Sequence, residues 1–207
     1  MSWPTYHDRH WWLGDWQLPG VTRVLKAAGL GVDYTGVDPD VLEHARQRGV
    51  YVDAACDALD TNTPLPPPAT PEQAEARARA AGYVTAWRDY RAATGWTPRY
   101  AQGVLYHPEL RYLGIPDSAD AVTVIDRKAT AKIARTYALQ LAAYTLDGLY
   151  ARQPDGTWQP WTATQRRVVH LKKDGTYGVR DYDDPTDFAV WTAAATVALH
   201  APRYQKG

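Results

Sequence analysis

Residues 114–144, GIPDSADAVTVIDRKATAKIARTYALQLAAY, decide how the rest of this chain is interpreted. The apolar, β-branched run at 121–125 predicts a strand, because such side chains fit the pleated surface of a sheet. Side chains alternate between the two faces of a strand, so Asp126 and Lys128 are expected on one face and Arg127 on the other. The stretch therefore brings an acidic and a basic side chain to the same side of a sheet.

A turn is predicted directly before this strand, at residues 117–120. It would fold residues 112–116 back beside the strand as a hairpin partner, and Asp117 would then approach Asp126. Two carboxylates and a lysine at a strand end form a hard-oxygen site for Mg²⁺ or Mn²⁺ with a positive group beside it. Hydrolysis of a phosphodiester needs this combination, because the metal acidifies a water and the lysine holds that water or the developing charge.

The ordered residues of this stretch resemble the PD-(D/E)XK nucleases, and within them the RecB-like and phage exonuclease branch. Asp-x-Lys alone is common in unrelated proteins, so the order of the whole set carries the resemblance. The alternative is a surface hairpin with a salt-bridged turn, followed by a core helix. The shared pattern is Gly-x-x-Asp, Asp-x-Lys and then Gln-x-x-x-Tyr, at Gly114, Asp117, Asp126, Lys128, Gln140 and Tyr144.

The resemblance implies an α/β fold with a restriction-endonuclease-like core, in which a mixed, mostly antiparallel sheet of about four or five strands is flanked by helices. It implies a Mg²⁺- or Mn²⁺-dependent deoxyribonuclease, most specifically an exonuclease of phage or recombination and repair type acting on single- or double-stranded DNA ends. Asp117 and Asp126 would hold the metal, and Lys128 would position or deprotonate the attacking water, with its pKa lowered if the side chain is partly buried beside the metal. Gln140 and Tyr144 would brace the active site and the nucleic acid.

Two positions depart from the family pattern. Relatives have Arg-Gly-x-x-x-His where this chain has Arg48, Gly49 and Asp53, and an aspartate is still a good oxygen ligand for either metal. The alternative for Asp53 is a solvated helix residue. Relatives also place a glutamate near Gln102, where this chain has no carboxylate. These departures support a rival hypothesis, a DNA-end or partner-binding module that has lost turnover; an endonuclease is a third.

Composition limits the classes of partner and site. The formal net charge is zero, so any DNA contact must come from a local basic patch. A predicted strand at 165–173 has basic ends, and its candidate phosphate contacts are Arg166, Arg167, Lys172 and Lys173. The single cysteine, Cys56, excludes an internal disulfide and any four-cysteine zinc or iron–sulfur site.

The 207 residues predict a single domain. No run of 18 apolar residues and no charged-then-apolar leader occurs, so we expect a cytoplasmic protein of a bacterial or phage-infected cell, without a membrane partner. A homo-oligomer or a recombination partner protein remains open.

The rest of the chain predicts helices around a core at 99–182. Before the core we expect an irregular aromatic arm at 1–18, helices at 18–30, 38–59 and 70–91, and a proline-rich spacer at 60–70. The helices and spacer should form a lobe over one edge of the sheet. In the core we expect a strand at 99–107, a helix at 133–150, and turns at Asp155-Gly156 and Asp174-Gly175, the second joining strands 165–173 and 177–182. A C-terminal helical segment follows at 184–203.

Overall fold

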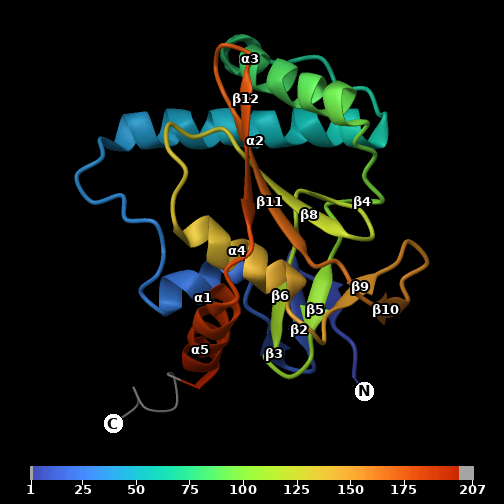
Figure 1. The fold of residues 1–207 in the computed structure, drawn as a ribbon. Coiled ribbons are helices and arrows are strands. Elements are labelled where there is room, and N and C mark those ends of the chain that lie inside the picture. The colour runs from blue at the N-terminus through green and yellow to red at the C-terminus, as the bar shows by residue number, and fades with distance from the viewer. Residues whose placement is uncertain (1, 201–207) are drawn as a thin grey trace.

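A five-stranded mixed sheet lies at the centre of the protein (Figure 1). This computed structural model describes residues 2–200. Strands β8 and β11 are parallel, and the other neighbours in the sheet are antiparallel. The predicted α/β class with a mostly antiparallel central sheet is confirmed. The strands, in spatial order, are β12 (Tyr177–Tyr182), β11 (Gln165–Leu171), β8 (Thr123–Lys128), β7 (Ser118–Ala119) and β4 (Tyr100–Ala101).

Helices cover both faces of this sheet, as Figure 1 shows. Val124 and Val168 belong to the core shared with α1 (Val21–Ala27), α4 (Thr136–Thr145) and α5 (Thr186–His200). Ile125 and Val169, the next residue of each strand, belong to the core shared with α2 (Pro39–Thr61) and α3 (Pro71–Thr94). The alternation of the strands therefore divides the interior into two cores. Helix α1 packs with α4 and α5, so the lobe consists of α2, α3 and the spacer alone. It covers a face of the sheet, and not one edge as expected.

The helix starts follow the capping residues in the sequence. Oδ1 of Asp38 accepts a hydrogen bond from the backbone N–H of Asp40 at 2.8 Å, and Pro39 occupies the first helical position of α2. Oγ1 of Thr70 accepts one from the N–H of Gln73 at 3.3 Å at the start of α3. Both helices run two or three residues beyond their predicted ends, and the segment between them contains neither helix nor strand.

Two further sheets lie outside the central one. A four-stranded antiparallel sheet has the order β10 (Trp158–Pro160), β9 (Tyr150–Arg152), β5 (Leu105–His107), β6 (Tyr112–Gly114). The N-terminal segment forms β1 (Thr5–His7), β2 (His10–Leu13) and β3 (Trp16–Gln17), so the prediction of an irregular arm is wrong. Asp8 and Arg9 make the β1–β2 turn with φ angles of 51° and 63°, a conformation usually marked by Asn or Gly in the sequence.

The strand predicted at 99–107 is interrupted. Gln102 has a φ of 55°, and the chain passes there from β4 in the central sheet to β5 in the four-stranded sheet. The hairpin partner predicted at 112–116 is also wrong, because β6 pairs with β5, whereas β7 pairs with β8. Oδ1 of Asp120 accepts hydrogen bonds from the N–H groups of Val122 and Thr123 and so closes the β7–β8 turn.

The C-terminal half follows the prediction more closely. Strands β11 and β12 pair over the expected turn at Asp174-Gly175, and the Asp155-Gly156 turn joins β9 to β10. Helix α4 is shorter than predicted, because the chain leaves it after Thr145 to form β9. Helix α5 ends the described chain, and the predicted positions 201–203 lie outside the described residues. No helix within residues 2–200 is long and apolar enough to cross a membrane.

Candidate active site

Asp126 and Lys128 lie on the same face of β8, as the alternation predicts. The Asp126 side chain is 1% exposed, and its Oδ2 lies 2.7 Å from Nζ of Lys128. The same ammonium lies 4.6 Å from the centre of the Tyr137 ring on α4. Oδ1 of Asp126 has no hydrogen-bond partner among residues 2–200. Since buried carboxylate oxygens are normally satisfied, this oxygen is available to a ligand.

Asp117 is held against β8 by the backbone. It precedes β7, and its Oδ2 accepts a hydrogen bond from the N–H of Arg127 at 2.7 Å. Its carboxylate is therefore anchored one residue away from Asp126. Burial raises the pKa of Asp126, the charge of Lys128 opposes this, and the charge of Asp117 raises it further. The two acids therefore repel each other, a situation that a bound cation would relieve.

Lys128 is held as an ammonium. Burial alone would lower its pKa, as expected from the sequence, but the charges of Asp126 and Asp117 outweigh burial and raise the pKa. The lowering was expected for a lysine beside a bound metal ion, and it stays a prediction. Lys128 is suited to orient a water or to offset negative charge on a phosphate, rather than to accept a proton.

Gln140 and Tyr144 form one wall of this site. Nε2 of Gln140 donates a hydrogen bond to the Tyr144 hydroxyl at 3.1 Å. The Tyr144 ring packs on Gly114, where an added Cβ would lie 2.7 Å from Cδ1 of the ring. Burial raises the pKa of Tyr144, and the charge of Asp126 adds to this. The structure therefore brings together Asp117, Asp126, Lys128, Gln140 and Tyr144.

Asp53 approaches from α2, the helix that covers the opposite face of the sheet. Asp53 is exposed to solvent, but desolvation by the protein around it raises its pKa to about 6, and the charge of Asp117 adds to the effect. Within residues 2–200, no group of three or more His, Cys, Asp or Glu side chains is arranged to hold a metal ion. Asp53, Asp117 and Asp126 thus form no three-residue metal cluster. Gln102 lies exposed in its bend and supplies no carboxylate.

The pair Asp117 and Asp126 nevertheless fits Mg²⁺ or Mn²⁺ in its donor chemistry. Magnesium is usually bound through one or two carboxylates and keeps several waters. The free Oδ1 of Asp126 and the mutual repulsion of the two acids meet that requirement without a third protein ligand.

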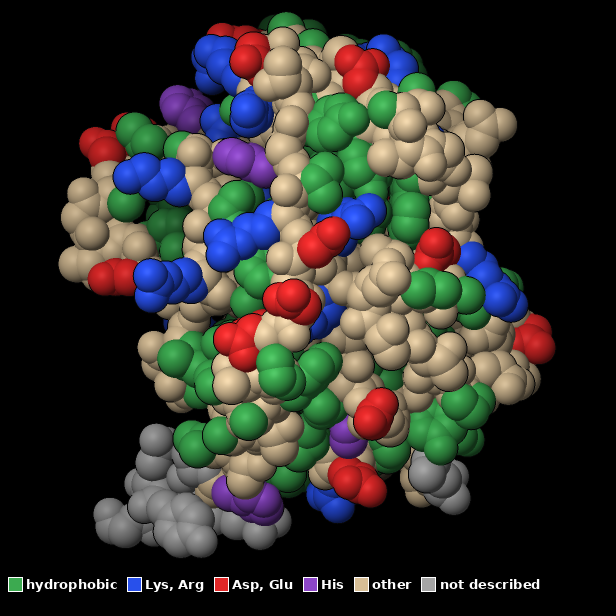
Figure 2. All heavy atoms as spheres, viewed as in Figure 1, with side chains coloured by type: hydrophobic (Ala, Val, Ile, Leu, Met, Phe, Trp, Pro, Cys, Tyr) green, Lys and Arg blue, Asp and Glu red, His purple; other side chains and the backbone are tan. Residues whose placement is uncertain are grey.

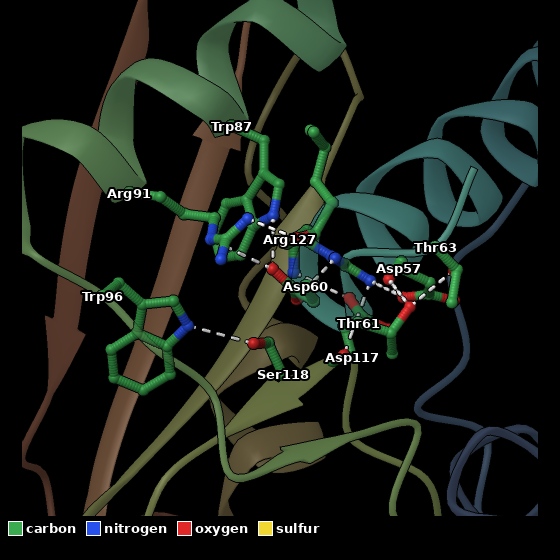
Figure 3. Close-up of polar contacts among 11 residues, drawn as sticks. Asp57, Asp60, Thr61, Thr63, Trp87, Arg91, Trp96, Asp117, Ser118 and Arg127 are labelled. Carbon is green, nitrogen blue, oxygen red and sulfur yellow. Dashed lines mark hydrogen bonds and ion pairs between the residues drawn. The ribbon is translucent and has the colours of Figure 1, made fainter. Parts of the chain in front are cut away.

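Arg127 points to the other face and ties β8 to both helices of the lobe (Figure 3). Its guanidinium bonds to Asp57, lies 3.1 Å from Oδ2 of Asp60, and stacks 5.1 Å from the centre of the Trp87 ring. Nε1 of Trp87 donates to Oδ1 of Asp60 at 2.9 Å. No sequence signal pairs these acids with Arg127.

Two of the four predicted phosphate contacts already have acidic partners. Arg166 is 3% exposed and donates from Nη1 to Asp187 Oδ2 at 2.8 Å. Arg167 makes two contacts with the Asp181 carboxylate, at 2.6 and 2.9 Å. Lys172 and Lys173 are exposed at the β11–β12 turn and form no ion pair with the described residues.

Sequence reasoning missed Arg180. The sheet register aligns Asp126 with Val168 and Val168 with Arg180, so this exposed arginine lies on the face of the candidate site. Figure 2 shows basic side chains gathered on this side of the molecule, beside β12 and over the loop before α4. The signal was present, because the Asp174-Gly175 turn sets the hairpin register and the register sets which residues share a face.

Comparisons with known proteins return a resemblance in structure alone. No family model matches the chain, and no curated protein matches it. Among solved structures, the chain is similar to an alkaline exonuclease (LHK-Exo) from Laribacter hongkongensis, with 15% identity, a TM-score of 0.49, and coverage of 91% of this chain and 89% of that chain. The structure of LHK-Exo in complex with dAMP gives 17% identity, a TM-score of 0.45 and the same coverage. At these values the likeness concerns the course of the backbone and assigns no role to any residue.

Proposed function

We propose that this protein is a metal-dependent nuclease of the PD-(D/E)XK type that hydrolyses DNA phosphodiester bonds, most specifically an exonuclease of phage or recombination type. One observation carries the proposal. Asp126 is a buried carboxylate with an unpartnered oxygen, placed between a lysine and a second acid at the end of the central strand. A buried carboxylate oxygen that accepts no hydrogen bond is costly in a purely structural role, so the arrangement favours a bound ligand.

Each side chain has a separate task in this proposal. Asp117 and Asp126 hold Mg²⁺ or Mn²⁺, which when bound polarises the phosphate and acidifies a water. Lys128 orients the attacking water and offsets the negative charge that develops on the phosphate. Gln140 and Tyr144 keep the wall behind Asp126 rigid, since their hydrogen bond and the contact with Gly114 fix the ring. Asp53 is proposed as a further ligand because its charge acts on Asp126, but the three acids are not arranged as a metal cluster among the described residues.

The proposed DNA contacts differ from those expected from the sequence. Arg166 and Arg167 are neutralised by Asp187 and Asp181, which makes them poor phosphate ligands. The exposed cations Lys172, Lys173 and Arg180 have no ion-pair partner among the described residues, so we place the phosphate path there. The substrate is a single- or double-stranded DNA end.

A DNA-end-binding module without turnover is the second candidate. The close Asp126–Lys128 ion pair favours it, because this pair occupies both groups that catalysis needs. The missing carboxylate at Gln102 supports it as well.

Incubation of end-labelled linear DNA and of covalently closed circular DNA with Mg²⁺, Mn²⁺ or EDTA separates these functions. The exonuclease degrades only the linear DNA, and only with a metal ion. Degradation of both DNAs would identify an endonuclease. Binding of ends without cleavage under any of these conditions would support the binding module.

A further inference from the structure

An aromatic pocket lies apart from the candidate active site, between the N-terminal sheet and the β9–β10 hairpin. Its volume is about 540 Å³, and rings from three separate segments of the chain line it. Trp3 precedes β1, Tyr6 lies on β1, Trp11 on β2 and Trp158 on β10. Pockets of this size hold small ligands or single groups of larger ones.

The rings pack against one another, and some of them remain exposed to solvent. Trp3 and Trp158 stack with centroids 5.7 Å apart and planes 8° from parallel. Trp11 meets Trp158 edge-on at 6.2 Å, and Tyr6 lies 5.2 Å from Trp11. Tyr6 is 60% exposed and Trp3 is 37% exposed. The pocket is thus a rigid stack of rings whose outermost members leave aromatic surface open to a ligand.

Among the described residues that line this pocket, the only charged side chain is a cation. The guanidinium of Arg152 on β9 lies 5.6 Å from the centre of the Trp11 ring. Arg152 is exposed and forms no ion pair with the described residues. None of the described lining residues is acidic. The pocket therefore offers flat apolar surfaces beside one uncompensated positive charge.

We propose that this pocket binds single-stranded DNA, with a base stacked on Tyr6 and Trp3 and the adjoining phosphate at Arg152. Unpaired bases stack on aromatic side chains whatever their sequence. A nearby arginine can bind the phosphate and make a cation–π contact with the ring. The inference rests on the proposed function for its choice of DNA. A proline-rich peptide also docks on aromatic grooves, but such a peptide gives the lone arginine no partner, whereas a phosphate does.

The test is equilibrium binding of a fluorescent oligothymidylate in EDTA, where cleavage plays no part. Tyr6→Ala should weaken binding by a factor on the order of ten. Arg152→Gln should weaken it as well and reduce the slope of log affinity against log salt by about 0.7. Tyr34→Ala is the matched control, because Tyr34 is 54% exposed in the loop between α1 and α2, outside the pocket. An abasic oligomer of equal length should bind more weakly than oligothymidylate and should not distinguish Tyr6→Ala from the unchanged protein.

The opposite results would overturn the inference. Unchanged affinity in Tyr6→Ala, or equal binding of the abasic oligomer, would mean that no base occupies the pocket. Competition by a proline-rich peptide at the Tyr6 surface, with no competition by oligothymidylate, would assign the pocket to a peptide. Binding is measured without metal and is therefore independent of cleavage. If Tyr6→Ala weakened oligothymidylate binding but the protein cleaved no DNA, only the proposed nuclease activity would be withdrawn.

Discussion

Gly114 lies directly against the ring of Tyr144. A Cβ on Gly114 would lie 2.7 Å from Cδ1 and 2.8 Å from Cε1 of that ring, closer than such atoms approach in proteins. The first and last residues of the stretch that decides the fold are thus in contact across the candidate site. The contact holds the segment leading to Asp117 against α4, and so couples the position of the acid to that of the wall.

Gly114→Ala should therefore displace the Tyr144 ring. Overpacking of this kind typically costs about 1–3 kcal/mol of stability, measured here as the free energy of unfolding in urea. The cleavage rate should fall as well, because Tyr144 is bonded to Gln140 beside Asp126. Gly49→Ala is the control, since nothing lies within 4 Å of a Cβ at that position in α2. Equal stability of the two variants would show that the ring moves aside without cost.

Arg127→Met should destabilise the protein severely. The Asp60 side chain is fully buried and is paired with Arg127 at 3.1 Å and with Arg91 at 3.4 Å, so removing Arg127 leaves its charge only partly compensated. Breaking a buried pair by removing one partner costs about 3–5 kcal/mol. Adding Asp60→Asn should recover part of that loss, because it removes a buried charge that only Arg91 would then compensate. Arg46→Ala, which breaks an exposed pair on α2, should have little effect on the urea midpoint. No recovery in the double variant would rule out Asp60 as the source of the cost.

Asp53 should destabilise the metal-free protein as pH rises. Its pKa is raised from 3.8 to about 6, so the folded state favours the neutral acid. The associated stability is present below the unfolded value and is lost as pH rises through about 6. In EDTA, the melting temperature of Asp53→Asn relative to the unchanged protein should therefore increase between about pH 5 and about pH 8. Ala54→Asn is the control, because it introduces the same amide one position away without removing a carboxylate. A difference in melting temperature between Asp53→Asn and the unchanged protein that does not vary with pH would contradict the raised pKa of Asp53.

Arg180→Gln should flatten the salt dependence of duplex DNA binding. One lost phosphate contact reduces the slope of log affinity against log salt by about 0.9. Arg23→Gln is a suitable comparison, because Arg23 is exposed on α1, on a different part of the surface. Arg166→Gln should instead lower the melting temperature, since its guanidinium bridges β11 to the start of α5 through Asp187 and Asp184. If the slope of log affinity against log salt changed in Arg166→Gln but not in Arg180→Gln, the DNA would contact Arg166 rather than Arg180.

The sequence predicted the features that depend on local periodicity. Alternation placed Asp126 and Lys128 on one face, and capping residues located the starts of α2 and α3 at Asp38 and Thr70. It failed where the chain changes sheet. Gln102 adopts a positive φ, which a glutamine in the sequence does not predict. The chain bends there, and the predicted strand is divided between two sheets.

The candidate site shows the same division between local and distant information. The pattern of Asp117, Asp126 and Lys128 is readable from spacing. The pairing of Arg166 with Asp187 joins residues 21 positions apart, and nothing local marks this arginine as buried rather than free to contact DNA.

The most direct test of the account compares nucleotide release from linear DNA by the unchanged protein, Asp126→Asn and Lys128→Met, each verified as folded by circular dichroism. We expect release only with Mg²⁺ or Mn²⁺, and a loss on the order of a hundredfold or more in each variant, because Asp126→Asn removes a proposed metal ligand and Lys128→Met removes the positive charge proposed to face the phosphate. Release by Lys128→Met at the unchanged rate, or the absence of any release by the unchanged protein with either ion, would contradict it.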